Sequence, residues 1–264
     1  MSKRRVIVFD DAAALAEAAA REVARTICNA VARRGVSTLV VAGGRTPRQL
    51  YERLAGEPYR ETIDWPRVEL FWGDERCVAP DHPKSNYRLA EVALLSKIPR
   101  GGNAHRIFGE IDPARAATLY EQEIRDASDG GLPRFDLILL GMGADGHTAS
   151  LFPDTPALLD ERRLVVATTS PQPPHHRVTV TLRVINAARK VMFLVTGGEK
   201  AATLVKVVRD GSGASAAALP AALVCPRGGR LIWLVDRAAA EGLDQVRPTG
   251  TNGPRYMDDQ LPTD

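Results

Sequence analysis

Short apolar runs alternate along the chain with segments in which apolar residues recur at helical spacing. Continuous apolar or β-branched runs predict strands, and apolar positions repeating every three to four residues predict helices. The predicted strands are 37–41, 68–72, 135–140, 164–168, 178–182, 191–195 and 231–235. The predicted helices are 12–31, 46–55, 86–95, 113–127, 199–208 and 237–240. This alternation favours an α/β fold with an open, mostly parallel sheet and helices on both faces.

The length and composition indicate one globular domain followed by a tail. The chain has 264 residues, of which 44% are hydrophobic and 25% charged. These values suit one large α/β domain, which we assign to 1–243. Residues 210–217 are small and polar and predict a surface loop. The tail 244–264 is rich in Pro, Gly, Asp and Thr, so it is either disordered or packed on a partner.

Charge and cysteine content exclude several classes of protein. The 35 basic and 32 acidic residues are too balanced to indicate a nucleic-acid-binding protein. Cys28, Cys77 and Cys225 lie far apart, which predicts neither a metal site nor a disulfide framework. The apolar run 6–9 is too short for a signal peptide, and the helix 12–31 carries charges that exclude a membrane span. We therefore expect a cytoplasmic protein.

A glycine pair followed by a helix start is a candidate phosphate site. Gly43 and Gly44 follow a predicted strand, and Thr46 is predicted to cap the helix in which Pro47 is the first residue. The free N–H groups of a helix N-terminus bind anions, and the side chains of Arg45 and Thr46 would add contacts. The alternative is an ordinary tight turn between a strand and a helix.

Charged residues follow further strands, and ligands bind at the carboxyl ends of strands in such sheets. Asp74 and Arg76 come directly after a strand, where Asp74 suits a sugar hydroxyl or a base role and Arg76 an anion or a carbonyl. Arg177 begins a strand, and Lys200 is predicted in the first turn of a helix, where a bound anion would explain a cation. Solvated surface charges are the alternative for each.

The glycine-rich segment 141–153 (GMGADGHTASLFP) follows the most apolar predicted strand. It carries His147, which is suited to take a proton from water at neutral pH. Asp145 stands two residues earlier, and a carboxylate beside a histidine fixes its tautomer and stabilises the imidazolium. The alternative is a histidine that only holds the loop together.

These segments resemble the glucosamine-6-phosphate isomerase/6-phosphogluconolactonase family, and its lactonase branch in particular. The resemblance covers about residues 6–240 and follows the order of six segments: 43–47 (GGRTP), 73–76 (GDER), 85–88 (SNYR), 141–153, 177–182 (RVTVTL) and 196–201 (TGGEKA). At two positions the chain departs from the family pattern, with Arg45 where serine is more usual and Cys77 where an aromatic residue is.

The resemblance implies a three-layer α/β/α fold with a Rossmann-like sheet, as in glucosamine-6-phosphate deaminase and ribose-5-phosphate isomerase. It implies hydrolysis of 6-phospho-D-glucono-1,5-lactone to 6-phospho-D-gluconate in the pentose phosphate pathway, with no metal or organic cofactor. The expected partner is this small molecule, with no nucleic acid or membrane, and the chain is expected to be a monomer or a weak homo-oligomer.

Two other functions are compatible with the same segments. The deaminase motif has a second acid five residues after the histidine, where this chain has Phe152. Ring opening needs that acid, whereas ester hydrolysis needs a base for water and stabilisation of the oxyanion, so the lactonase is favoured. A sugar-phosphate-binding regulator without activity is the third possibility, and the presence of both His147 and Asp145 speaks against it.

Overall fold

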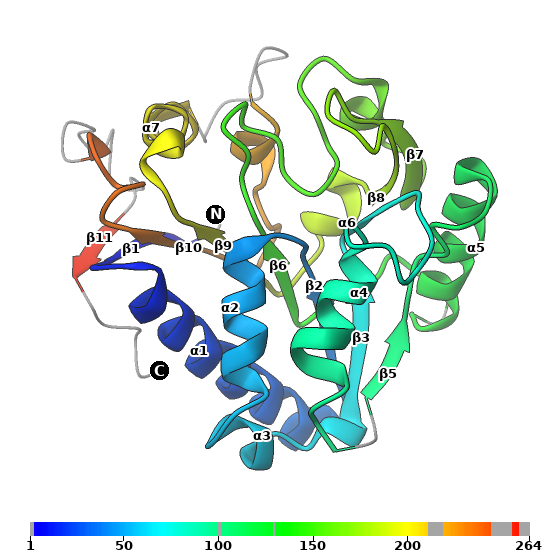
Figure 1. Ribbon diagram of the computed structural model, residues 1–264, viewed down its shortest axis with the longest axis horizontal. Coiled ribbons are helices and arrows are strands. Elements are labelled where there is room, and N and C mark those ends of the chain that lie inside the picture. The colour runs from blue at the N-terminus through cyan, green and yellow to red at the C-terminus, as the bar shows by residue number, and fades with distance from the viewer. Residues whose placement is uncertain (1–2, 100–101, 129, 211–218, 244–254, 259–264) are drawn as a thin grey trace.

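The computed structural model describes residues 3–99, 102–128, 130–210, 219–243 and 255–258. Its central feature is a parallel sheet of eight strands in the order β11-β1-β10-β9-β6-β2-β3-β5 (Figure 1). The strands are β1 (Lys3–Phe9), β2 (Ser37–Val41), β3 (Val68–Trp72), β5 (Gly102–His105), β6 (Leu137–Leu140), β9 (Lys190–Val195), β10 (Arg230–Asp236) and β11 (Arg255–Asp258).

Helices cover both faces of this sheet, as the α/β prediction required (Figure 1). Every residue of β6 is buried, and β9 and β10 are buried except at their first residue, which is the pattern of strands covered on two sides. The helices are α1 (Ala12–Arg34), α2 (Arg45–Leu54), α3 (Tyr59–Thr62), α4 (Asn86–Ala90), α5 (Pro113–Asp126), α6 (Leu182–Ile185) and α7 (Ala201–Asp210). Glu91–Leu95 continues α4 as a π-helical turn.

A second, antiparallel sheet contains three strands that the sequence analysis assigned differently. It has the order β4 (Asp74–Arg76), β8 (His176–Val180) and β7 (Val165–Thr169). The predicted strands at 164–168 and 178–182 are therefore real, but their placement in the parallel sheet was wrong. From Val166 to Thr169, half-buried and exposed residues alternate along β7, as in a strand with one covered face. Its pairing partner is decided by contacts distant in sequence.

Two smaller predictions were also wrong, and two others concern segments that lie largely outside the described residues. Thr46 is not the helix cap, because α2 begins one residue before it and Gly44 occupies the cap position. Residues 237–240 form turns and not a helix. In the tail, Arg255–Asp258 forms β11 and pairs with β1, while 244–254 and 259–264 lie outside the described residues. The loop predicted at 210–217 also lies outside them, apart from residue 210, which ends α7.

Two buried tyrosines close the ends of adjacent strands β2 and β3. The Tyr51 hydroxyl donates to the carbonyl of Ala42 at 2.7 Å and accepts its N–H at 2.9 Å. The Tyr120 hydroxyl does the same for Trp72, at 2.9 and 2.7 Å. Because these backbone groups are satisfied, the chain can leave the sheet at the next residue without leaving a buried polar group unpaired.

No helix among the residues that the structure describes is long and apolar enough to cross a membrane.

Candidate active site

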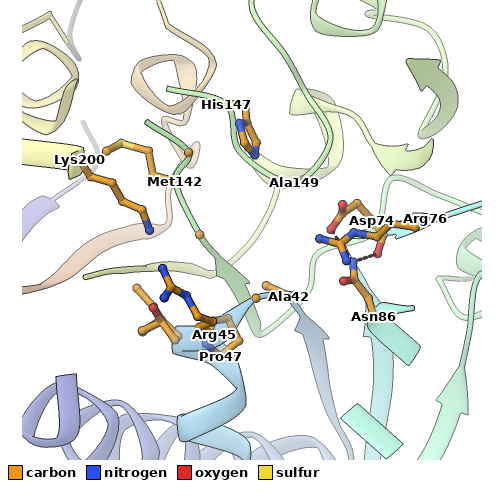
Figure 2. Close-up of a pocket in the computed structure, with 16 residues that line it drawn as sticks. Ala42, Arg45, Pro47, Asp74, Arg76, Asn86, Met142, His147, Ala149 and Lys200 are labelled. Carbon is orange, nitrogen blue, oxygen red and sulfur yellow. Dashed lines mark hydrogen bonds between the residues drawn. The ribbon is translucent and has the colours of Figure 1, made fainter. Parts of the chain in front are cut away.

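A pocket opens at the carboxyl ends of four neighbouring strands, β3, β2, β6 and β9 (Figure 2). This is the edge at which open parallel sheets bind their ligands. Segments that follow these strands supply nearly all of its wall. The lining residues are Ala42, Gly43, Gly44, Arg45, Thr46, Pro47, Asp74, Arg76, Asn86, Gly141, Met142, Gly143, His147, Ala149, Leu194 and Lys200.

One end of the pocket combines a helix N-terminus with two cationic side chains. Gly44 has φ of 116°, a conformation that favours glycine, and no side chain caps the N-terminus of α2 that follows it. Arg45 and Lys200 point toward each other across this end (Figure 2). Burial lowers the pKa of Lys200, Glu199 opposes this shift, and the nearby charge of Arg45 adds to it. Two cations facing one helix N-terminus favour a phosphate group between them.

Thr46 contributes to this end through its position and not as a cap. Its hydroxyl lies 2.8 Å from the hydroxyl of Thr196, which follows β9. The bond joins the start of α2 to the segment that leads to Lys200. Lys200 itself lies in a short 3₁₀ turn, Gly198–Lys200, immediately before α7. The two segments that the sequence analysis assigned to phosphate therefore meet at one end of the pocket.

His147 points into the middle of the pocket (Figure 2). Its Nδ1 lies 2.5 Å from Oδ1 of Asp145, which also accepts the backbone N–H of His147 at 3.1 Å. No hydrogen bond joins the other ring nitrogen, Nε2, to any residue that the structure describes. A histidine held at Nδ1 by a carboxylate, with Nε2 free, has the arrangement of a general base.

The loop around His147 depends on a glycine that packs against the ring. A Cβ at Gly143 would lie 2.2 Å from Cε1 and Nδ1 of His147 and 2.6 Å from Oδ1 of Asp145. The ring also contacts Phe152, with the ring centroids 4.7 Å apart. The backbone at Gly143, the Phe152 ring and the Asp145 carboxylate together restrict the direction of the imidazole.

The far side of the pocket carries Asp74 and Arg76 (Figure 2). Both side chains face the pocket because alternate residues of a strand share a face, and Glu75 between them faces α4. Asp74 is buried, and its carboxylate accepts hydrogen bonds from Ser150 and Asn86. Arg76 donates from Nη1 to the carbonyl of Lys84 at 2.6 Å, while its Nε has no partner among the described residues.

Most residues singled out in the sequence line the pocket, and Asp145 and Arg177 do not. Asp145 contacts His147, which does line it. Arg177 is buried beside β4 but does not line the pocket, and it donates to the carbonyl of Pro174 and the hydroxyl of Ser170. Asn86 and Ser150 were not predicted as site residues, although both lie in segments that carry the family resemblance.

Comparison with known proteins identifies the family. The model of the family described as glucosamine-6-phosphate isomerases/6-phosphogluconolactonase matches residues 10–233. The chain belongs to this family. A member named 6-phosphogluconolactonase from Synechocystis is 42% identical over 84% of this chain and 90% of its own length. The Streptomyces coelicolor protein of the same name is 38% identical over 90% of this chain and 94% of its own.

Solved structures of family members agree with the fold. The 6-phosphogluconolactonase from Trypanosoma cruzi has a TM-score of 0.81 at 30% identity, covering 92% of this chain and 98% of that protein. A monomeric glucosamine-6-phosphate deaminase has a TM-score of 0.74 at 22% identity over 89% of this chain and 98% of its own length. At that identity the likeness shows the shared fold alone.

Proposed function

We propose that this protein is a 6-phosphogluconolactonase, which hydrolyses 6-phospho-D-glucono-1,5-lactone to 6-phospho-D-gluconate in the pentose phosphate pathway. The observation that carries the proposal is a histidine–aspartate pair, His147 and Asp145, that faces a pocket with a cationic end. Relatives with the name 6-phosphogluconolactonase, 42% and 38% identical over most of the chain, support the same reaction.

In the proposed mechanism, the lactone phosphate binds where Gly43, Gly44 and the N-terminus of α2 face Lys200 and Arg45. His147 then removes a proton from water as the water oxygen attacks C1, and Asp145 orients the ring and stabilises the imidazolium. The imidazolium returns the proton to the ring oxygen as the C1–O bond breaks. No covalent intermediate with the enzyme is needed.

Arg76 is assigned to the oxyanion that develops at C1. The sequence alone left it open whether this guanidinium serves the oxyanion or the phosphate. Figure 2 shows it on the side of the pocket away from Arg45 and Lys200. A phosphate held by those two cations leaves Arg76 beside the ring, where a fixed positive charge stabilises developing negative charge. Asp74 beside it is assigned to a ring hydroxyl as a hydrogen-bond acceptor.

The environment of His147 favours ester hydrolysis over sugar-ring opening. The position that carries a second acid in the deaminase motif is Phe152 here, and its ring packs directly against the imidazole. Asp145 is the carboxylate that forms a hydrogen bond with His147. One acid is enough to support a base that activates water. A single domain over 1–243 and a cytoplasmic location stay predictions.

The proposal is tested with a coupled assay on freshly generated 6-phosphogluconolactone, after spontaneous hydrolysis has been subtracted. His147→Ala is expected to lower kcat by about 10²–10⁴-fold, the usual contribution of a general base. His176→Ala is the matched control, because this exposed histidine does not line the pocket. Near-wild-type turnover by His147→Ala would contradict the assignment.

The same preparation is incubated with glucosamine 6-phosphate, and ammonia is measured. Release of ammonia would identify a deaminase. A folded wild-type protein that binds 6-phosphogluconate but turns over neither substrate would be the sugar-phosphate-binding regulator. We expect lactone turnover and no ammonia.

A further inference from the structure

The carboxylate of Asp74 is held by two neutral side chains to which the mechanism above gives no role. Asn86 Nδ2 donates to Oδ1 of Asp74 at 3.2 Å and to its backbone carbonyl at 2.8 Å. The Ser150 hydroxyl donates to Oδ2 at 2.7 Å. Both donors are buried, and each carboxylate oxygen has one of them. The direction of this carboxylate is therefore set before any substrate enters.

The Asn86 side chain has only one orientation available to it. Its Nδ2 is committed to Asp74, so its Oδ1 faces Gly43, where a Cβ would lie only 1.8 Å away. That oxygen has no hydrogen-bond partner among the described residues, so the neighbouring backbone and not a second bond fixes the amide. The Asn86 backbone is fixed as well, because the buried carboxylate of Glu75 accepts its N–H at 2.7 Å and that of Tyr87 at 2.7 Å.

Ser150 connects Asp74 to the loop that carries His147. Its backbone N–H donates to the hydroxyl of Thr179 on β8 at 3.2 Å, which holds it beside the small sheet. Ala149 before it has φ of 49°, a left-handed conformation that turns the chain sharply between His147 and Ser150. One short loop thus positions both the histidine and a donor to Asp74.

We propose that Asn86 and Ser150 are positioning residues that fix the Asp74 carboxylate toward the pocket, where it accepts a hydrogen bond from a hydroxyl of the lactone ring. The inference rests on the function proposed above. A carboxylate has more acceptor positions than these two donors fill, so capacity remains for the substrate. Asp74 lies opposite the phosphate end, so it meets the part of the ring far from the phosphate-bearing carbon.

Asn86→Asp tests this with almost no change in shape. It replaces the amide donor by a carboxyl group beside Asp74. Other ionisable groups around Asp74 include Glu75, Arg76, Arg177 and Tyr51, and His147 lines the same pocket. Two adjacent carboxyl groups repel when both are ionised and share a proton when the pH falls. The protonated carboxyl then donates to Asp74 as the amide did.

The measured quantity is kcat/KM of the variant divided by that of wild type at each pH from 5 to 7.5, which cancels ionisations common to both proteins. For Asn86→Asp we expect a loss of about tenfold or more at pH 7.5, as for a lost hydrogen bond to a charged group, and recovery toward pH 5. Asn103→Asp is the matched control. Asn103 is exposed, does not line the pocket and donates to Glu69 at 2.7 Å, so its ratio should stay within about twofold.

A double-mutant cycle gives a second test that does not depend on Asn86→Asp folding. If Ser150 acts through Asp74, Ser150→Ala lowers kcat/KM in wild type but has no further effect in Asp74→Asn. Additive losses in the cycle would overturn the positioning role, as would a pH-independent loss in folded Asn86→Asp.

Binding of 6-phosphogluconate, measured by calorimetry at the same pH values, separates this inference from the proposed function. Affinity for Asn86→Asp should follow the same pH dependence without any turnover. Failure of folded wild type to hydrolyse the lactone would refute the lactonase proposal. Unchanged affinity of Asn86→Asp across the pH range would refute the positioning proposal.

Discussion

Gly143→Ala places one methyl group where the imidazole of His147 now lies. The added Cβ would be 2.2 Å from Cε1 and Nδ1, whereas ordinary contact begins at 3.4 Å, so the ring has to retreat by more than 1 Å. It cannot do so freely, because Phe152 also contacts the ring and Asp145 holds Nδ1. A misplacement of about 1 Å in a catalytic group costs on the order of 10²-fold in rate.

We therefore expect Gly143→Ala to lower kcat by about 10²-fold in the lactone assay, while KM, set mainly at the phosphate end, changes little. Gly73→Ala is the control, because its added Cβ would meet Val40 and Val41 at 3.6 Å, which is ordinary contact. Thermal melting should show both variants folded. A Gly143→Ala enzyme with wild-type kcat would refute the claim that this glycine fixes the histidine.

Three further changes test other parts of the structure. Lys200→Ala should raise KM by about tenfold or more and leave kcat nearly unchanged if the phosphate is bound equally in ground and transition states; a lower kcat at constant KM would contradict this. Tyr51→Phe leaves both backbone groups of Ala42 unpaired and should cost about 1–3 kcal/mol in urea unfolding at unchanged m-value; an unchanged midpoint would refute it. Burial alone would raise the pKa of Glu121, but hydrogen bonds from Arg163, Arg125 and two backbone N–H groups hold it at about 2. Glu121→Gln should therefore cost about 2 kcal/mol near pH 7, and this difference should vanish as the pH falls from 4.5 toward 2, since the stabilisation is lost when the carboxylate is protonated; a pH-independent difference would argue against it.

The parallel sheet could be predicted where the local pattern reflects burial on both sides. Strand β6 is apolar throughout, and its prediction needed no knowledge of its neighbours. Three strands of the same sheet, β1, β5 and β11, were missed, the first two for a local reason. Strand β1 begins with Lys3, Arg4 and Arg5, and β5 reads Gly-Asn-Ala-His, so neither shows a full apolar run.

The small antiparallel sheet shows a different limit. Two of its three strands were predicted, and β4 was not. Their pairing depends on contacts between residues distant in sequence, such as Asp74 with Thr179 and Val166 with Thr179. The local sequence of a strand with one buried face does not indicate which sheet the strand joins. Arg177 was placed in the pocket for the same reason, since nothing in its neighbourhood shows that Ser170 and the Pro174 carbonyl bind its guanidinium.

Charged residues of the candidate site were predictable because ligands bind at the carboxyl ends of strands in such sheets, so charges there indicate a site. The neutral side chains that hold Asp74 were not. Ser150 reaches Asp74 across 76 positions of sequence and Asn86 across 12, and both side chains would be equally acceptable in a surface turn. Their importance arises only when the fold buries them against a carboxylate.

The pocket is divided between the two sheets, and Gly73 is the boundary. Its N–H donates to Val41 of the parallel sheet at 3.0 Å, and its carbonyl accepts from Val180 of the antiparallel sheet at 2.9 Å. The anion end follows strands of the parallel sheet, whereas Asp74 and Arg76 belong to β4 of the small one. In the function proposed above, the phosphate therefore binds at segments of the parallel sheet, while Asp74 and Arg76 of the small sheet contact the sugar ring.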